Sequence, residues 1–127
     1  MFPELRAEIN PARRDRHHRF NYYLLFFDLY AIFREALEAS DEPTLTRLFE
    51  YAQWSFQQAR RAPDLNNAVC VCFYEHLFDV ARRDWPDIAR RLSPPVIRAC
   101  WTLWEGRHSE EEMERLREIL SAVARDS

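Results

Sequence analysis

Glycine occurs only once in this 127-residue chain, at Gly106. Tight turns between β-strands depend on glycine, because it adopts positive φ without strain, so the sequence argues against a turn-rich β protein. The same scarcity excludes the glycine-rich loops that hold phosphate groups in many nucleotide-binding proteins. We therefore look for helices whose ends are marked by proline and by short polar residues.

Apolar residues recur at helical spacing in three long stretches. The first predicted helix has its deepest apolar stripe at Tyr22, Phe26, Leu29, Tyr30, Phe33 and Leu37. Capping residues and prolines suggest where each helix begins and ends. The predicted spans are about His17 to Ala39, from a Ser40–Asp41 cap to about Arg61, and from Asp64 or Asn66 to about Arg83.

Shorter helices are predicted on both sides of these three. One follows Pro3 and runs to about Ile9, and others begin after Asp84 and Ser93. Gly106 is expected to end the helix that follows Ser93, as a residue that tolerates positive φ. Ser109 and Glu112 have the spacing of a capping box, which predicts a last helix to about Ala124.

These elements predict an all-α fold in a single domain over residues 1–127, with residues 1–16 and 107–127 peripheral. We expect a compact bundle of three long antiparallel helices plus three to four shorter ones, because the connections are short. Stacking of helix pairs as in an α-solenoid is the alternative arrangement.

Composition limits the cellular setting and the kind of partner. With 47% hydrophobic and 31% charged residues, the chain has the balance of a folded globular protein. Its net charge of −3 gives no bulk attraction to nucleic acid. Three cysteines cannot all pair, and no signal-peptide pattern begins the chain, so we expect a cytoplasmic location. The apolar run from Phe20 to Phe33 is too short to cross a membrane.

All 18 basic residues are arginines, and several of them cluster. Pairs at Arg60–Arg61, Arg82–Arg83 and Arg90–Arg91 resemble a nucleic-acid stripe, but each falls at the predicted C-terminal end of a helix, where the helix dipole favours cations. A better basic patch precedes the first long helix, and it could bind an acidic partner or a phosphate backbone, or simply be a solvated segment. It consists of Arg13, Arg14, Arg16, His17, His18 and Arg19.

The third predicted helix places Cys72, His76 and Asp79 on one stripe, with Glu75 beside it. Cys72 and His76 could touch one ion, but a structural zinc needs four ligands and no second pair has ligand spacing. A nucleophilic cysteine would also need an oxyanion site, which nothing in the sequence supplies. We therefore expect no metal, no cofactor and no enzymatic activity. Glu75 is expected to be partly shielded and paired, because apolar residues surround it.

The first long helix has polar and apolar residues opposite its deepest stripe. Either this helix is central in the bundle, or these residues form a contact surface with an apolar centre and an acidic edge. The candidate partner-binding residues are Leu24, Phe27, Asp28, Glu35 and Glu38. Any of the four tryptophans could also contribute to a binding hot spot, although tryptophans more often pack in the core.

Several short segments carry a resemblance to a known group of proteins. They are Leu48–Glu50, Asn67–Val71, Phe73–Leu77, Leu92–Pro94 and Trp101–Gly106. In their order the chain resembles a family of small, uncharacterised bacterial all-helical proteins, some of which are associated with toxin-immunity settings. The resemblance spans roughly residues 20 to 106 and rests on core and capping residues, so it bears on the fold more than on the function.

Two functions follow as expectations. The favoured one is a non-enzymatic protein-binding module, an immunity-like or antitoxin-like protein that inhibits another protein, which could be a basic toxin; assembly with copies of itself is also compatible with the sequence. The alternative is a nucleic-acid-associated regulator that uses residues 13–19. Binding that weakens steeply with salt would indicate the second.

Overall fold

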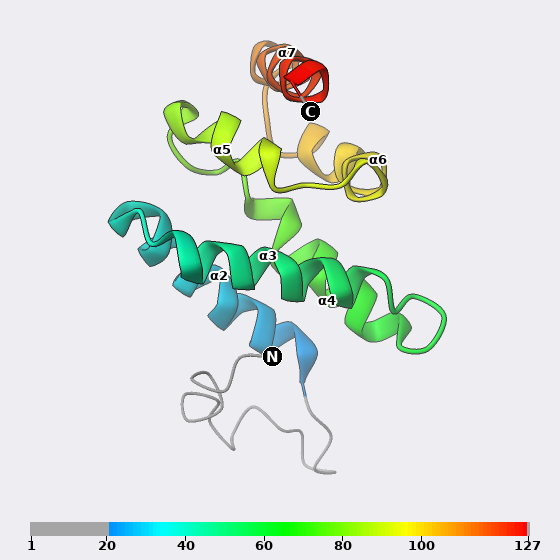
Figure 1. Ribbon diagram of the computed structural model, residues 1–127. Coiled ribbons are helices and arrows are strands. Elements are labelled where there is room, and N and C mark those ends of the chain that lie inside the picture. The colour runs from blue at the N-terminus through cyan, green and yellow to red at the C-terminus, as the bar shows by residue number, and fades with distance from the viewer. Residues whose placement is uncertain (1–20, 127) are drawn as a thin grey trace. The chain divides into compact units, whose positions relative to one another are not determined.

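The computed structural model describes residues 21–126, which form six α-helices and two short 3-10 helices and contain no strand (Figure 1). The prediction of an all-α fold is confirmed. The elements are α2 (Tyr22–Ala39), α3 (Glu42–Phe56), α4 (Pro63–Cys72), η2 (Tyr74–His76), η3 (Arg82–Asp84), α5 (Trp85–Arg90), α6 (Pro94–Glu105) and α7 (Glu110–Asp126). The short helix predicted near Pro3 lies outside the described residues. No helix in residues 21–126 is both long and apolar enough to cross a membrane.

The contacts divide the chain into two compact units, one ending at Phe73 and the other beginning at Tyr74. The single domain expected from the sequence stays a prediction, since two units can still fold together. In the first unit, α2, α3 and α4 pack on one another, and α3 runs back along α2 (Figure 1). At their centre, the rings of Phe33, Phe49 and Phe73 meet edge to face, with centroids 5.7–5.9 Å apart.

Two polar residues set the ends of α2. The side chain of Asn21 accepts hydrogen bonds from the main-chain N–H groups of Tyr23 and Leu24, so α2 begins at Tyr22. The earlier part of the predicted span, from His17, lies outside the described residues. Ser40 ends it in the left-handed conformation, with a φ of 55°, and its N–H bonds back to the helix. Asp41 alone then caps α3, through the N–H of Thr44.

The second long helix is shorter than predicted. It ends at Phe56, and residues 57–61 form turns where the sequence led us to expect helix up to Arg61. The side chain of Asn66 donates to the carbonyl oxygen of Phe56 at 2.6 Å, which satisfies one acceptor at the helix end. This bond ties the start of α4 to the end of α3.

The third predicted long helix is much shorter than the span up to Arg83. In the structure, α4 starts at Pro63 and ends at Cys72, because Phe73 leaves the helical conformation at a φ of −124° and a ψ of −68°. A single 3-10 turn and an irregular segment follow. Leu77 and Phe78, which continued the apolar periodicity, are buried in the second unit instead.

In the second unit, α5 and α6 both contact α7, and η2 packs on α6. Its core is built on Phe78, whose ring meets the rings of Trp85 and Trp104 edge to face at 5.5 and 5.0 Å. Two of the three predicted caps at this end are present, whereas the side chain of Asp84 makes no capping hydrogen bond at the start of α5. Ser93 caps α6, and Ser109 and Glu112 exchange the two hydrogen bonds of a capping box at 3.0 and 3.1 Å. Gly106 does follow α6, but its φ is −72°, so positive φ is not the reason for a glycine there.

Candidate functional site

The outward face of α2 carries the residues predicted to bind a partner. Phe27 is 52% exposed, and Glu35 and Glu38 are exposed as well. Leu24 and Asp28 are half-buried at its edge. A helix buried on all sides, the alternative read from the sequence, would have covered Phe27. We refer to Leu24, Phe27, Asp28, Glu35 and Glu38 as the α2 outward face.

The opposite side of α2 supplies the core. Of the predicted deep stripe, Phe26, Leu29 and Phe33 are buried, whereas Tyr22, Tyr30 and Leu37 are half-buried. Two further exposed residues, Ala31 and Arg34, share the side of Phe27, since they follow it by one and two helical turns. Sequence reasoning missed Arg34, although its spacing of seven residues from Phe27 was a signal for it. The face is therefore acidic but not uniformly so.

Among residues 21–126, Trp54 on α3 is the second large apolar side chain that is exposed, at 43%. Trp85 and Trp104 are buried and Trp101 is half-buried. The indole of Trp54 stacks on the ring of Tyr51, and Tyr51 stacks on buried Phe26, with centroids 6.0 and 5.9 Å apart. This column leads from the core to the surface and holds the Trp54 ring in place.

Tyr51, at the middle of this column, has a raised pKa. Burial is the main cause and the neighbouring hydroxyl of Tyr22 adds to it, while a hydrogen bond with Ser55 acts in the opposite direction. The phenol therefore stays neutral over the physiological pH range.

The arginine clusters have different surroundings. The basic patch predicted at Arg13, Arg14, Arg16, His17, His18 and Arg19 lies outside the described residues. Arg90 and Arg91 both contact Asp87, at 3.2 and 3.3 Å. Arg82 approaches the carboxylates of Glu111 and Glu112 at 3.5 and 3.9 Å. These contacts are ordinary ion pairs within the second unit.

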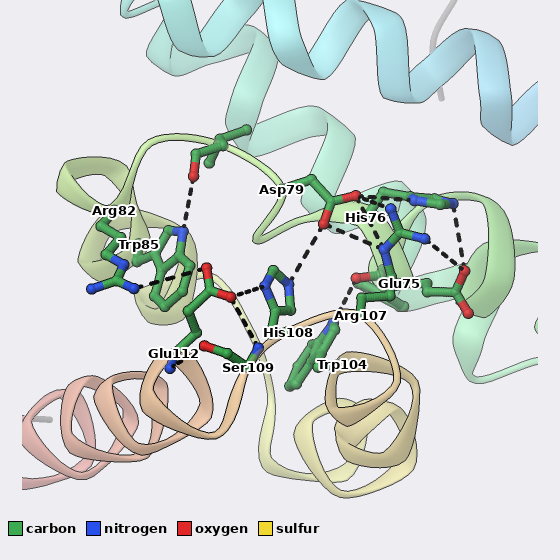
Figure 2. Close-up of polar contacts among 12 residues, drawn as sticks. Glu75, His76, Asp79, Arg82, Trp85, Trp104, Arg107, His108, Ser109 and Glu112 are labelled. Carbon is green, nitrogen blue, oxygen red and sulfur yellow. Dashed lines mark hydrogen bonds and ion pairs between the residues drawn. The ribbon is translucent and has the colours of Figure 1, made fainter.

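A polar cluster in the second unit is centred on Asp79 (Figure 2). The guanidinium of Arg107 donates to both carboxylate oxygens of Asp79, with Nε at 3.3 and 3.2 Å. His76 Nδ1 lies 3.3 Å from the same carboxylate, and His108 Nε2 lies 3.5 Å from it. Asp79 thus binds the connection between α6 and α7 to the segment that follows η2.

His108 is the most deeply buried titratable residue of this cluster. Its side chain is 6% exposed, and its ring meets the indole of Trp85 edge to face at 5.8 Å. The second ring nitrogen, Nδ1, lies 3.7 Å from a carboxylate oxygen of Glu112. The ring therefore fills the space between Asp79, Glu112 and the core (Figure 2).

Two carboxyl groups of the cluster have lowered pKa values. Burial raises the pKa of Asp79. Hydrogen bonds from Arg107 and His76 and the charges of Arg107 and His108 lower it, and their combined effect is larger than that of burial, so the pKa is lowered overall. For Glu112, the hydrogen bond from the main chain of Ser109 is the largest cause, and burial opposes it. Both groups are therefore ionised at neutral pH.

The geometry argues for a structural role of this cluster. Both ring nitrogens of His76 face carboxylates, with Nε2 3.6 Å from Glu75, so neither is directed at an open space. Glu75 is 24% exposed and lies 3.9 Å from Arg107, so it is shielded and paired as predicted. Cys72 is buried at the end of α4, so the shared helical stripe predicted for Cys72 and His76 does not exist. Within residues 21–126, no three His, Cys, Asp or Glu side chains are placed to hold a metal ion.

The model of a family described as a domain of unknown function, DUF7674, matches residues 1–121. The chain belongs to the DUF7674 family. No curated protein and no solved structure matches it. The DUF7674 match includes the whole α2 outward face, Trp54 and the Asp79 cluster, so all three lie in the family's domain.

Proposed function

We propose that this DUF7674 protein is a non-enzymatic protein-binding module that acts through the α2 outward face. The observation that carries the proposal is the 52% exposure of Phe27 on a helix whose opposite side is buried in the core. Exposed aromatic side chains on a rigid helix are typical anchors of protein interfaces, because their burial on binding contributes a large apolar area.

The charges around Phe27 favour a basic partner. Glu35 and Glu38 are exposed one turn apart on the same side of α2, against the single arginine Arg34. Acidic residues around an apolar anchor steer a positively charged surface into contact and reject an acidic one. The resemblance to helical proteins from toxin-immunity settings suggests the class of partner, a toxin with a basic surface that this protein inhibits.

The proposal is tested by capturing partners from the source organism and then rebuilding the interaction from purified components. We expect a basic protein to bind wild type and to lose at least tenfold in affinity for Phe27→Ala and for the double variant Glu35→Arg, Glu38→Arg. One buried aromatic anchor is worth about 2 kcal/mol or more, which corresponds to that loss. If the partner is toxic, co-expression of wild type should restore growth, and the double variant should not.

A matched control reverses two exposed acids elsewhere, with Glu105→Arg and Glu118→Arg on α6 and α7. This variant has the same change in net charge and should bind the partner as wild type does. Equal binding by all folded variants would exclude the α2 outward face. If no protein binds but wild type retains nucleic acid at low salt, and loses it when residues 13–19 are changed, the regulator hypothesis replaces this one.

A further inference from the structure

Among residues 21–126, Arg60 and Arg61 differ from the pairs Arg82–Arg83 and Arg90–Arg91. Arg82, Arg90 and Arg91 lie near carboxylates and only Arg83 of these two pairs has no side-chain partner, whereas neither Arg60 nor Arg61 has one. The helix dipole does not explain them either. They lie four and five residues beyond the end of α3 and directly before the N-terminal end of α4, where the dipole opposes positive charge.

The exposed indole of Trp54 lies close to these arginines along the chain. The carbonyl oxygen of Trp54 accepts hydrogen bonds from the main-chain N–H of Gln57 and from the side chain of Gln58, at 3.2 and 3.1 Å. The carbonyl of Gln58 in turn accepts from the N–H of Arg61 at 3.0 Å. Two successive hydrogen-bonded turns therefore connect Trp54 to Arg61, and the side chains of Trp54, Arg60 and Arg61 are each exposed.

The stacked column makes Trp54 a rigid platform. Its indole lies nearly parallel to the ring of Tyr51, with 15° between the planes, and Tyr51 rests on buried Phe26. A planar group that stacks on Trp54 therefore meets a surface that is already ordered, which reduces the entropy lost on binding. Planar bases next to phosphates are the chemistry that an ordered aromatic ring and unpaired guanidinium groups recognise together.

We propose that Trp54, Arg60 and Arg61 form a binding site for single-stranded nucleic acid. A base stacks on the indole of Trp54, and the guanidinium groups of Arg60 and Arg61 contact neighbouring phosphates. Acidic polypeptides would satisfy the arginines but carry no base to stack on the indole. The site shares no residue with the α2 outward face or with the predicted patch at residues 13–19.

The test measures binding of the full chain to a labelled oligothymidylate of about ten nucleotides, a length within the usual site size of single-strand binders. Binding is followed over a salt series. Each phosphate neutralised on a single strand contributes a slope of about −0.7 to the plot of log affinity against log salt. We expect the double variant Arg60→Gln, Arg61→Gln to make the slope less negative by about 1.4, which corresponds to two phosphates. Trp54→Ala should weaken binding about tenfold at every salt concentration and leave the slope unchanged.

Matched controls use exposed residues of the same kinds. Arg83→Gln with Arg90→Gln repeats the loss of two positive charges, and Phe27→Ala removes another exposed aromatic side chain. Both variants should bind the oligonucleotide as wild type does. Thermal melting of each variant confirms that it is folded. The proposal is overturned if wild type does not bind at about 50 mM salt, or if the Arg60, Arg61 variant keeps the full slope. Displacement by polyglutamate as effective as by oligonucleotide, or loss of binding only when residues 13–19 are changed, would overturn it as well.

Discussion

The indole Nε1–H of Trp104 donates a hydrogen bond to the main-chain carbonyl oxygen of Tyr74 at 2.8 Å, and both residues are fully buried. This single bond links α6 to η2 through two residues that lie 30 positions apart in the sequence. The same carbonyl also accepts a hydrogen bond from the main-chain N–H of Leu77 at 3.2 Å, so Trp104 supplies its second hydrogen bond.

Replacing Trp104 by phenylalanine removes this donor, while the carbonyl of Tyr74 keeps its bond from Leu77. We expect Trp104→Phe to lower the free energy of unfolding by about 1–3 kcal/mol, because a buried hydrogen bond worth about 0.5–1.5 kcal/mol is lost together with the packing of the larger ring. Urea denaturation measures the change. The same replacement at exposed Trp54 is the control and should change stability by less than about 0.5 kcal/mol. Equal effects at the two positions would show that the bond to Tyr74 does not matter.

Acid should weaken the second unit through Asp79. Because the folded protein lowers the pKa of this carboxyl, ionised Asp79 stabilises the fold above its ordinary pKa of about 3.9, and this contribution is lost as pH falls through the lower folded value. Asp79→Asn should cost about 1 kcal/mol at neutral pH, in keeping with a partly exposed ion pair. It should also flatten the fall in stability below pH 4. A variant that loses stability with acid as steeply as wild type would contradict this account.

Gly106 should tolerate a side chain. Its φ of −72° is accessible to any residue, and an added Cβ would meet the carbonyl oxygens of Leu103 and Thr102 at 3.5 and 3.7 Å, which is ordinary contact. We expect Gly106→Ala to stabilise the protein by about 0.4–1 kcal/mol, because alanine restricts the unfolded chain. A drop in melting temperature would mean that the end of α6 needs glycine for another reason.

Ser40 presents the opposite case. With a φ of 55°, it is the only residue of the described chain in the left-handed conformation. A Cβ atom is strained there, so Ser40→Gly should stabilise the protein by about 0.5–1 kcal/mol despite the greater freedom of glycine when unfolded. The neighbouring exposed position Ala39 serves as a control, since glycine there interrupts α2 and should destabilise it. Calorimetry that ranks Ser40→Gly below wild type would refute the strain argument.

Helix beginnings were predictable where their signals are local. Asp41, Ser93 and the Ser109–Glu112 pair each act within three residues, and the structure has all of them as caps. The break after Cys72 was not predictable in this way. No glycine or proline marks it, and Leu77 and Phe78 continue the helical spacing only because the core of the second unit also needs apolar side chains there. Tertiary packing overrides periodicity at that point.

The candidate sites were predictable to different degrees. The exposed side of α2 follows from counting turns on one helix, so Phe27, Glu35 and Glu38 could be placed from the sequence. The contact of His76 with Asp79 was found by the same counting, although the segment is not the helix assumed. Arg107 lies 28 residues from Asp79, and no local pattern indicates that they meet. The unpaired state of Arg60 and Arg61 likewise depends on where α3 ends.

The six residues from Arg107 to Glu112 combine an anchor with a helix start. Arg107 and His108 contact Asp79, and Ser109 and Glu112 begin α7 immediately afterwards. This connection should therefore tolerate neither an insertion nor a deletion, because either would change the spacing between the residues that contact Asp79 and the residues that cap α7. Natural variants of this chain that gain or lose residues should do so in the turns at 57–61, and keep the spacing of 107–112 unchanged.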